Sequence, residues 1–140
     1  MITIATRHHD ISCAHRIYGH SGKCGRLHGH EYRIHFHCEA DALNDLGMVV
    51  DFGVIKEKLC AWLDDNWDHK VLLWRIDQLS TALSGICGVE VVATDFNPTA
   101  ENMARFLVDE VGPKQLTGTS VRLVSVVVEE TRKCSASHSV

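Results

Sequence analysis

The chain has 140 residues, of which 45% are hydrophobic and 23% are charged, and its formal net charge is −4. This length suits one domain with a core of its own, so we expect residues 1–140 to form a single domain. The acidic balance argues against a nucleic-acid partner, and no apolar stretch approaches the roughly 18 residues of a membrane helix. The N-terminus lacks the apolar region of a signal peptide, so we expect a cytoplasmic protein with reduced thiols.

The first third of the chain predicts two strands joined by a loop. Residues 2–17 favour an extended segment, and residues 18–27 contain three glycines and favour a loop. Residues 28–39 alternate between apolar and polar side chains, as in a half-buried strand. One face of these two strands carries Ile11, Cys13, His15, Ile17, His28, His30, Tyr32, Ile34, Phe36 and Cys38.

Two helices and a closing strand are predicted further along. Asp51 can cap a helix over residues 52–64, and Thr99 can cap another helix after Pro98. Their inner stripes are Ile55, Leu59, Trp62 and Leu63 in the first, and Ala100, Met103, Ala104, Leu107 and Val111 in the second. Residues 120–130 favour a closing strand.

Residues 70–97 have the weakest pattern. A short helix near Ile76–Leu83 and a strand near Val89–Ala93 fit them best. The predicted order is strand, strand, helix, helix, strand. This order favours an α+β fold in which two helices cover one face of an antiparallel sheet.

Three histidines predict a metal site. His28 and His30 are two residues apart on one strand, so their side chains share a face. If the hairpin forms, His15 joins them from the preceding strand. Three neutral imidazoles with one open position are typical of catalytic zinc, although ordinary hydrogen-bonded strand histidines are the alternative. His35 and His37 have the opposite parity and are predicted not to be ligands.

Cys24 is the candidate catalytic thiol. It lies between Lys23 and Arg26 in the glycine-containing loop, four residues before His28. Nearby cations favour a thiolate, and a thiolate beside a Lewis-acid metal can remove a proton from a bound substrate. The alternative is an incidental loop cysteine. The six cysteines show no C-x-x-C spacing, which argues against a zinc finger.

Two further carboxylate motifs could take part in chemistry. Asp68 precedes His69, and a carboxylate can orient an imidazole, although adjacent residues meet only in a loop. Glu129 and Glu130 end the last predicted strand, where a carboxylate could pair with the two N–H donors of a guanidine-like heterocycle. The alternatives are a solvated polar loop and an exposed acidic strand end.

These motifs together resemble those of the 6-pyruvoyltetrahydropterin synthase superfamily. The central block is Cys-Gly-Arg-Leu-His-Gly-His-Glu-Tyr at residues 24–32, with Ala14-His15-Arg16 upstream. Val50-Asp51-Phe52-Gly53, Asp68-His69, Pro98-Thr99-Ala100-Glu101-Asn102 and Glu130-Thr131 follow in the family's order. Residues 70–97 are longer than the link in compact members, and the tail after Thr131 lacks the family's common aromatic-glycine ending.

The Cys-x3-His-Gly-His spacing resembles the 6-carboxytetrahydropterin synthase branch of queuosine (7-deazaguanine) biosynthesis, because the animal biopterin enzymes have a longer gap there. The resemblance implies a zinc-dependent carbon–carbon/carbon–oxygen lyase. Its substrate would be 7,8-dihydroneopterin triphosphate, and its products 6-carboxytetrahydropterin, acetaldehyde and triphosphate. It also implies the tunnelling fold, in which the sheets of a homohexamer join into a barrel with active sites at subunit interfaces.

The resemblance assigns a role to each matching residue. His15, His28 and His30 would bind Zn²⁺. The catalytic set would be Cys24, His69, Asp68 and Glu130, with His69 reaching the site across an interface. Glu130, Thr99 and Glu101 would bind the substrate, with Glu130 anchoring the pterin ring.

Two alternatives stay open at this point. One is a relative that makes 6-pyruvoyltetrahydropterin or cleaves a dihydropterin side chain as an aldolase. The other, of a different class, is a zinc-stabilised interaction module without turnover. An open metal position beside a thiol argues against the module, because structural zinc is usually closed by four protein ligands.

Overall fold

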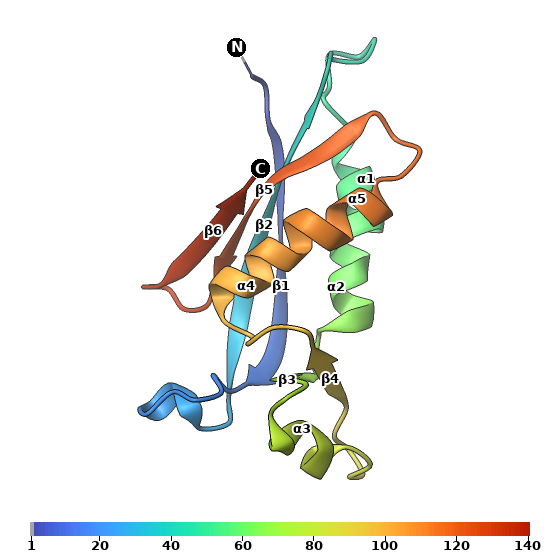
Figure 1. The fold of residues 1–140 in the computed structure, drawn as a ribbon. Helices are drawn as coiled ribbons and strands as arrows, with labels where there is room; N and C mark the ends of the chain where they lie inside the picture. Colours follow the sequence, from blue (N-terminus) through green and yellow to red (C-terminus); the bar gives the residue numbers. More distant parts are fainter. Residues whose placement is uncertain (1) are drawn as a thin grey trace.

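An antiparallel sheet forms the centre of the fold, which we describe for residues 2–140 from a computed structural model (Figure 1). Its antiparallel strands are the two long strands β1 (Ala5–His15) and β2 (His28–Ala40), followed by β5 (Val121–Glu129) and β6 (Ser135–Ser139). β1 pairs with β2, β2 with β5, and β5 with β6. The register of β1 and β2 places His15 opposite His28 and Cys13 opposite His30. The two predicted strands therefore pair as the hairpin that convergence of the three histidines requires.

Two short parallel strands extend the sheet on the other edge of β1. β3 (Val71–Trp74) pairs parallel with β1, and β4 (Val91–Thr94) pairs parallel with β3. Within residues 2–140 the sheet has six strands, in the order β4-β3-β1-β2-β5-β6. The antiparallel sheet predicted from the sequence thus carries two additional parallel strands, because residues 70–97 form a strand-helix-strand unit. Its helix α3 (Gln78–Leu83) supplies the crossover that a parallel pair needs.

The two predicted long helices are present and begin at the predicted caps. The first runs through α1 (Phe52–Ile55), a π-helical turn (Lys56–Cys60) and α2 (Ala61–Asn66), and the second through α4 (Ala100–Phe106), a π-helical turn (Leu107–Val111) and α5 (Gly112–Gln115). The Asp51 carboxylate accepts a hydrogen bond from the Gly53 amide at 2.7 Å, and the Thr99 hydroxyl accepts one from the Asn102 amide at 3.1 Å. In residues 2–140 no helix combines the length and apolar character needed to cross a bilayer.

Both helices cover the same face of the sheet, so the α+β prediction is confirmed (Figure 1). Their stripes bury Ile55, Leu59, Leu63, Met103 and Leu107 against Tyr32, Ile34 and Phe36 of β2. The histidines at positions 15, 28 and 30 belong to this covered face. His35 and His37 point to the opposite face, as predicted, where the His35 Nε2 atom lies 2.7 Å from Glu129.

Candidate metal centre

Three imidazoles converge where the β1–β2 hairpin opens into its loop. His15 is the last residue of β1, and His28 and His30 lie at the start of β2. Each residue offers a ring nitrogen, and these three atoms lie within 4.8 Å of one another. The ring centroids of His15 and His28 are 4.7 Å apart, and those of His28 and His30 are 4.8 Å apart. The sequence-predicted triad is therefore a group that could hold a metal ion.

Backbone carbonyls orient two of the three rings. Nδ1 of His15 lies 2.7 Å from the Pro98 carbonyl oxygen, and Nδ1 of His28 lies 2.6 Å from that of Arg26. A carbonyl only accepts, so each Nδ1 must carry the proton and donate it, which leaves each Nε2 unprotonated. The Tyr32 hydroxyl lies 3.2 Å from both nitrogens of the His15 ring and closes the buried side.

The third histidine has a buried nitrogen without a hydrogen-bond partner. Among residues 2–140, Nε2 of His30 is the one buried side-chain nitrogen or oxygen in this state. The Glu130 Oε1 atom lies 3.4 Å away but not in hydrogen-bonding geometry. Burial lowers the pKa of His15 and of His30, which keeps both imidazoles neutral, as ligands must be. The donor set and the unpaired nitrogen fit a divalent transition metal.

Cys24 lies in the loop between the two strands that carry the histidine triad. It sits in a single 3-10 turn (Lys23–Gly25) and is an exposed free thiol. Its carbonyl oxygen accepts a hydrogen bond from the Ile17 amide at 2.7 Å. The loop thus begins after His15 and ends before His28, so both of its ends adjoin residues of the triad.

Asp68 and His69 form a pair at the edge of β1. Asp68 Oδ1 accepts from the Ser12 amide at 2.9 Å, and its Oδ2 lies 3.0 Å from Nδ1 of His69. Burial alone would raise the pKa of Asp68, but the hydrogen bonds from Ser12 and His69 lower it. The adjacent side chains meet because His69 adopts a left-handed backbone with φ of 61°, which is uncommon outside glycine.

The His69 side chain is not part of the triad within one chain. It is 80% exposed and borders a hollow of about 470 Å³ that Gly29, His30 and Glu31 also line. Gly29 and Glu31 alternate with His28 and His30 along β2, so they belong to the face away from the helices. The structure therefore brings the triad and Cys24 to one end of the hairpin but leaves the His69 ring facing solvent.

The remaining candidate residues are placed around the triad. Glu130 is half-buried with a carboxylate oxygen near His30, whereas Glu129 pairs with His35 on the other face. The Thr99 hydroxyl is occupied as the cap of α4, and Glu101 is exposed in the first turn of that helix. Sequence reasoning missed three groups that orient the triad, namely the Pro98 and Arg26 carbonyls and the Tyr32 hydroxyl. Of these, only Tyr32 could have been found from the sequence, because its position in β2 puts it on the same face as His28 and His30.

Comparisons with known proteins agree with this fold and site. The family model described as 6-pyruvoyl tetrahydropterin synthase matches residues 4–139. A protein of Rickettsia felis named 6-carboxy-5,6,7,8-tetrahydropterin synthase is 36% identical over 130 residues, which cover 92% of this chain and 94% of the relative. A protein of Haemophilus influenzae with the same name is 31% identical over 118 residues, covering 79% of this chain and 83% of the relative.

Solved structures share the fold. The 6-pyruvoyl tetrahydropterin synthase of Caenorhabditis elegans superposes with a TM-score of 0.70 and 23% identity, over 100% of this chain and 96% of that one. An uncharacterized protein from Wolinella succinogenes gives a TM-score of 0.85 with 21% identity, over 99% and 98% of the two chains.

The curled sheet with helices on one face is that of the tunnelling-fold proteins, here with a histidine triad that could bind a metal. The chain belongs to the 6-pyruvoyl tetrahydropterin synthase family and is an enzyme of this type, a lyase. The resemblance of its motifs to this superfamily is thereby confirmed.

Proposed function

We propose that the chain is a zinc-dependent 6-carboxy-5,6,7,8-tetrahydropterin synthase of queuosine-type biosynthesis. It would convert 7,8-dihydroneopterin triphosphate and one water into 6-carboxytetrahydropterin, acetaldehyde and triphosphate. The observation that carries this proposal is the convergent triad of His15, His28 and His30 with the Cys24 loop beside it. Full-length relatives named for this activity and the Cys-x3-His-Gly-His spacing support the choice of reaction.

The reaction needs no external oxidant or reductant. The pterin ring gains two hydrogens as the first side-chain carbon is oxidised to a carboxyl group, and the other two carbons leave as acetaldehyde. Such a redistribution requires protons to move between ring and side chain, so the enzyme must supply acid–base groups around the side chain. A bound zinc ion would supply Lewis acidity that polarises the side-chain oxygens and acidifies the neighbouring positions.

The chain's own residues would orient the metal ligands, transfer the proton and bind the substrate. The carbonyls of Pro98 and Arg26 fix His15 and His28 in the tautomer that leaves Nε2 free for the metal. Cys24 would take the proton, because it is an exposed thiol in the loop that joins the two ligand-bearing strands. Glu130, near His30, would anchor the pterin ring through its N–H donors. Thr99 and Glu101, at the start of α4, remain candidate substrate contacts.

His69, oriented by Asp68, would complete the relay from a neighbouring chain. Its ring is exposed and borders a hollow that is also lined by His30. The edge strands β4 and β6 each have one neighbour in the sheet of residues 2–140, and unpaired edges favour association with further chains. A homohexameric barrel would satisfy both features, because it would cover the edges and bring His69 of one chain to the Cys24 of another.

Product analysis tests the proposal. The zinc-loaded protein is incubated with 7,8-dihydroneopterin triphosphate, and the products are identified by mass spectrometry. We expect 6-carboxytetrahydropterin and acetaldehyde, and we expect Cys24→Ala to lower turnover by about 10²–10⁴-fold. Cys87→Ala, which removes another exposed thiol, is the matched control and should keep wild-type turnover.

The other outcomes identify the alternatives. A 6-pyruvoyl product, or a dihydropterin that has lost its side chain without ring reduction, would assign the chain to the synthase or aldolase alternative. Absence of any turnover by the metal-loaded oligomer would support the interaction module and overturn the proposal.

A further inference from the structure

The loop that carries Cys24 has no buried core of its own. Residues 16–27 include no buried residue, so their conformation depends largely on polar contacts. Within the loop, the Ile17 amide donates to the Cys24 carbonyl at 2.7 Å, and the His20 amide donates to the Ile17 carbonyl at 3.2 Å. Gly25 passes so close that a Cβ there would lie 2.2 Å from the His20 carbonyl oxygen. The position of Cys24 therefore depends on where Ile17 is held.

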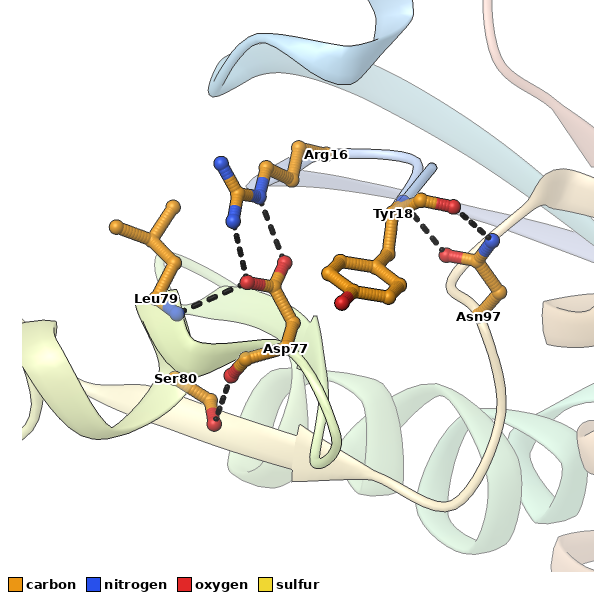
Figure 2. Close-up of polar contacts among 6 residues, drawn as sticks. All are labelled: Arg16, Tyr18, Asp77, Leu79, Ser80 and Asn97. Carbon is orange, nitrogen blue, oxygen red and sulfur yellow. Dashed lines mark hydrogen bonds and ion pairs between the residues drawn. The ribbon is translucent and has the colours of Figure 1, made fainter. Parts of the chain in front are cut away.

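The residue before Ile17 is fixed by a two-pronged ion pair. Nε of Arg16 donates to Oδ2 of Asp77 at 2.6 Å, and Nη2 donates to the other oxygen (Figure 2). The Asp77 side chain is completely shielded from solvent and also accepts the Leu79 amide at 2.8 Å, which caps α3. A planar guanidinium held at both donors by a buried carboxylate has little freedom to move, so Arg16 is fixed to the start of α3.

The residue after Ile17 is fixed by an amide side chain. Asn97 accepts from the Tyr18 amide at 3.0 Å and donates to the Tyr18 carbonyl at 3.1 Å, so it pairs with both backbone groups of one residue (Figure 2). The Tyr18 ring packs edge-on against Trp74, with ring centroids 6.1 Å apart. Ile17 thus lies between two residues that are both anchored to the segment 74–97.

The same segment also reaches the candidate metal centre. Pro98 follows Asn97 and accepts the His15 Nδ1 proton at 2.7 Å. The end of β1 and the start of the loop are therefore held at three positions. His15 contacts Pro98, Arg16 pairs with Asp77, and Tyr18 pairs with Asn97. In Figure 1 the loop and α3 lie at the same end of the sheet, which allows these contacts between the loop and the segment 74–98.

We infer that the strand-helix-strand segment 71–97 positions the catalytic loop, and that Asp77 and Asn97 are positioning residues for Cys24. This inference rests on the proposed function only in assigning the proton transfer to Cys24. It gives a role to a segment that contributes no ligand to the triad. It also explains why Asp77 stays buried although a shielded carboxylate is costly without a partner.

Hydrogen exchange in the metal-free protein tests the bracing directly. The informative amides are those of Ile17 and His20, because their acceptors lie inside the loop and no substitution touches them. We expect Asn97→Ala and Asp77→Asn to speed their exchange by about tenfold, the effect of losing one or two net hydrogen bonds. Amides of β2 and α4 should exchange at the wild-type rate.

The control is Asp95→Asn, which removes an exposed ion pair with Arg75 from the same segment. It should leave the Ile17 and His20 amides unchanged. If Asp77→Asn does not fold, Asn97→Ala decides the outcome alone, since it removes only a partly exposed side chain. Wild-type exchange at both amides in a folded Asn97→Ala protein would overturn the inference.

Kinetics provide the second readout. In the zinc-loaded enzyme we expect Asn97→Ala to lower kcat by about tenfold or more with KM nearly unchanged, because misplacing a catalytic group costs rate rather than binding. Asn97→Asp keeps the acceptor for Tyr18 but loses the donor, so it should be intermediate. An unchanged kcat despite faster exchange would overturn the positioning role. An inactive wild-type protein would instead refute the proposed function, and the exchange rates would still decide the bracing.

Discussion

The unpaired nitrogen of His30 leads to a prediction in which the sign of a stability change depends on metal. Nε2 of His30 is buried without a hydrogen bond, whereas Nε2 of His35, on the opposite face of the same strand, lies 2.7 Å from Glu129. Both side chains are mostly buried, at 17% and 26% exposed. His30→Leu therefore removes an unpaired buried nitrogen that destabilises the metal-free fold. His35→Leu, the same change on the other face, removes a hydrogen bond.

The expected magnitudes follow from these contacts. A buried group without a partner costs about 1–3 kcal/mol, so metal-free His30→Leu should be about 1 kcal/mol more stable than the wild type. His35→Leu should lose about 1.5–3 kcal/mol, the net value of a hydrogen bond to a charged group. For a chain of this length, about 1 kcal/mol shifts Tm by roughly 4 °C. Zinc at about 100 times its Kd should add about 2.7 kcal/mol to every variant that keeps the site.

The assay is thermal unfolding of the wild type, His30→Leu and His35→Leu, each with a chelator and with added zinc. Chelated His30→Leu should melt at or above the wild-type Tm, and added zinc should raise its Tm far less than that of the other two proteins. His35→Leu should melt lower than the wild type under both conditions, with a normal zinc shift. A chelated His30→Leu protein that is destabilised as much as His35→Leu, or that keeps the full zinc shift, would refute the assignment of His30 as a ligand.

Three further predictions follow from the same structure. Inactive Cys24→Ala and His69→Ala chains, dissociated and reassembled together, should recover part of the activity, and no recovery in confirmed mixed oligomers would place both residues in one chain's site. The Arg16 hydrogen bond lowers the pKa of Asp77, so its stabilisation is present above the unfolded pKa near 3.8 and is lost as pH falls through the lower folded pKa. Asp77→Asn should therefore weaken the dependence of chemical denaturation midpoints on pH below about pH 4. A thiol reagent should label the folded chain rapidly at the exposed cysteines, Cys24, Cys87 and Cys134, and label Cys13, Cys38 and Cys60 only after unfolding.

Much of the central fold could be predicted because its signals are local. Alternation in residues 28–39 fixes which side chains share a face, and the caps Asp51 and Thr99 mark where the helices begin. The strands β3 and β6 gave no such signal. Val71–Trp74 is a short apolar run without alternation, and Ser135–Ser139 consists mainly of small polar residues that rarely indicate a strand. Their place in the sheet is decided by neighbours that lie far away in the sequence.

The same distinction explains which parts of the site were predictable. Residues two positions apart on a strand share a face, so the convergence of His28 and His30 can be deduced from their spacing. The partners that set the tautomers are backbone carbonyls, which every residue possesses and no residue type reveals. Arg26 is two residues from its histidine, but Pro98 is 83 residues from His15 and reaches it only because the segment before α4 crosses the end of β1. The candidate ligands can thus be deduced from the sequence, whereas the hydrogen-bond partners that orient their rings depend on the completed fold.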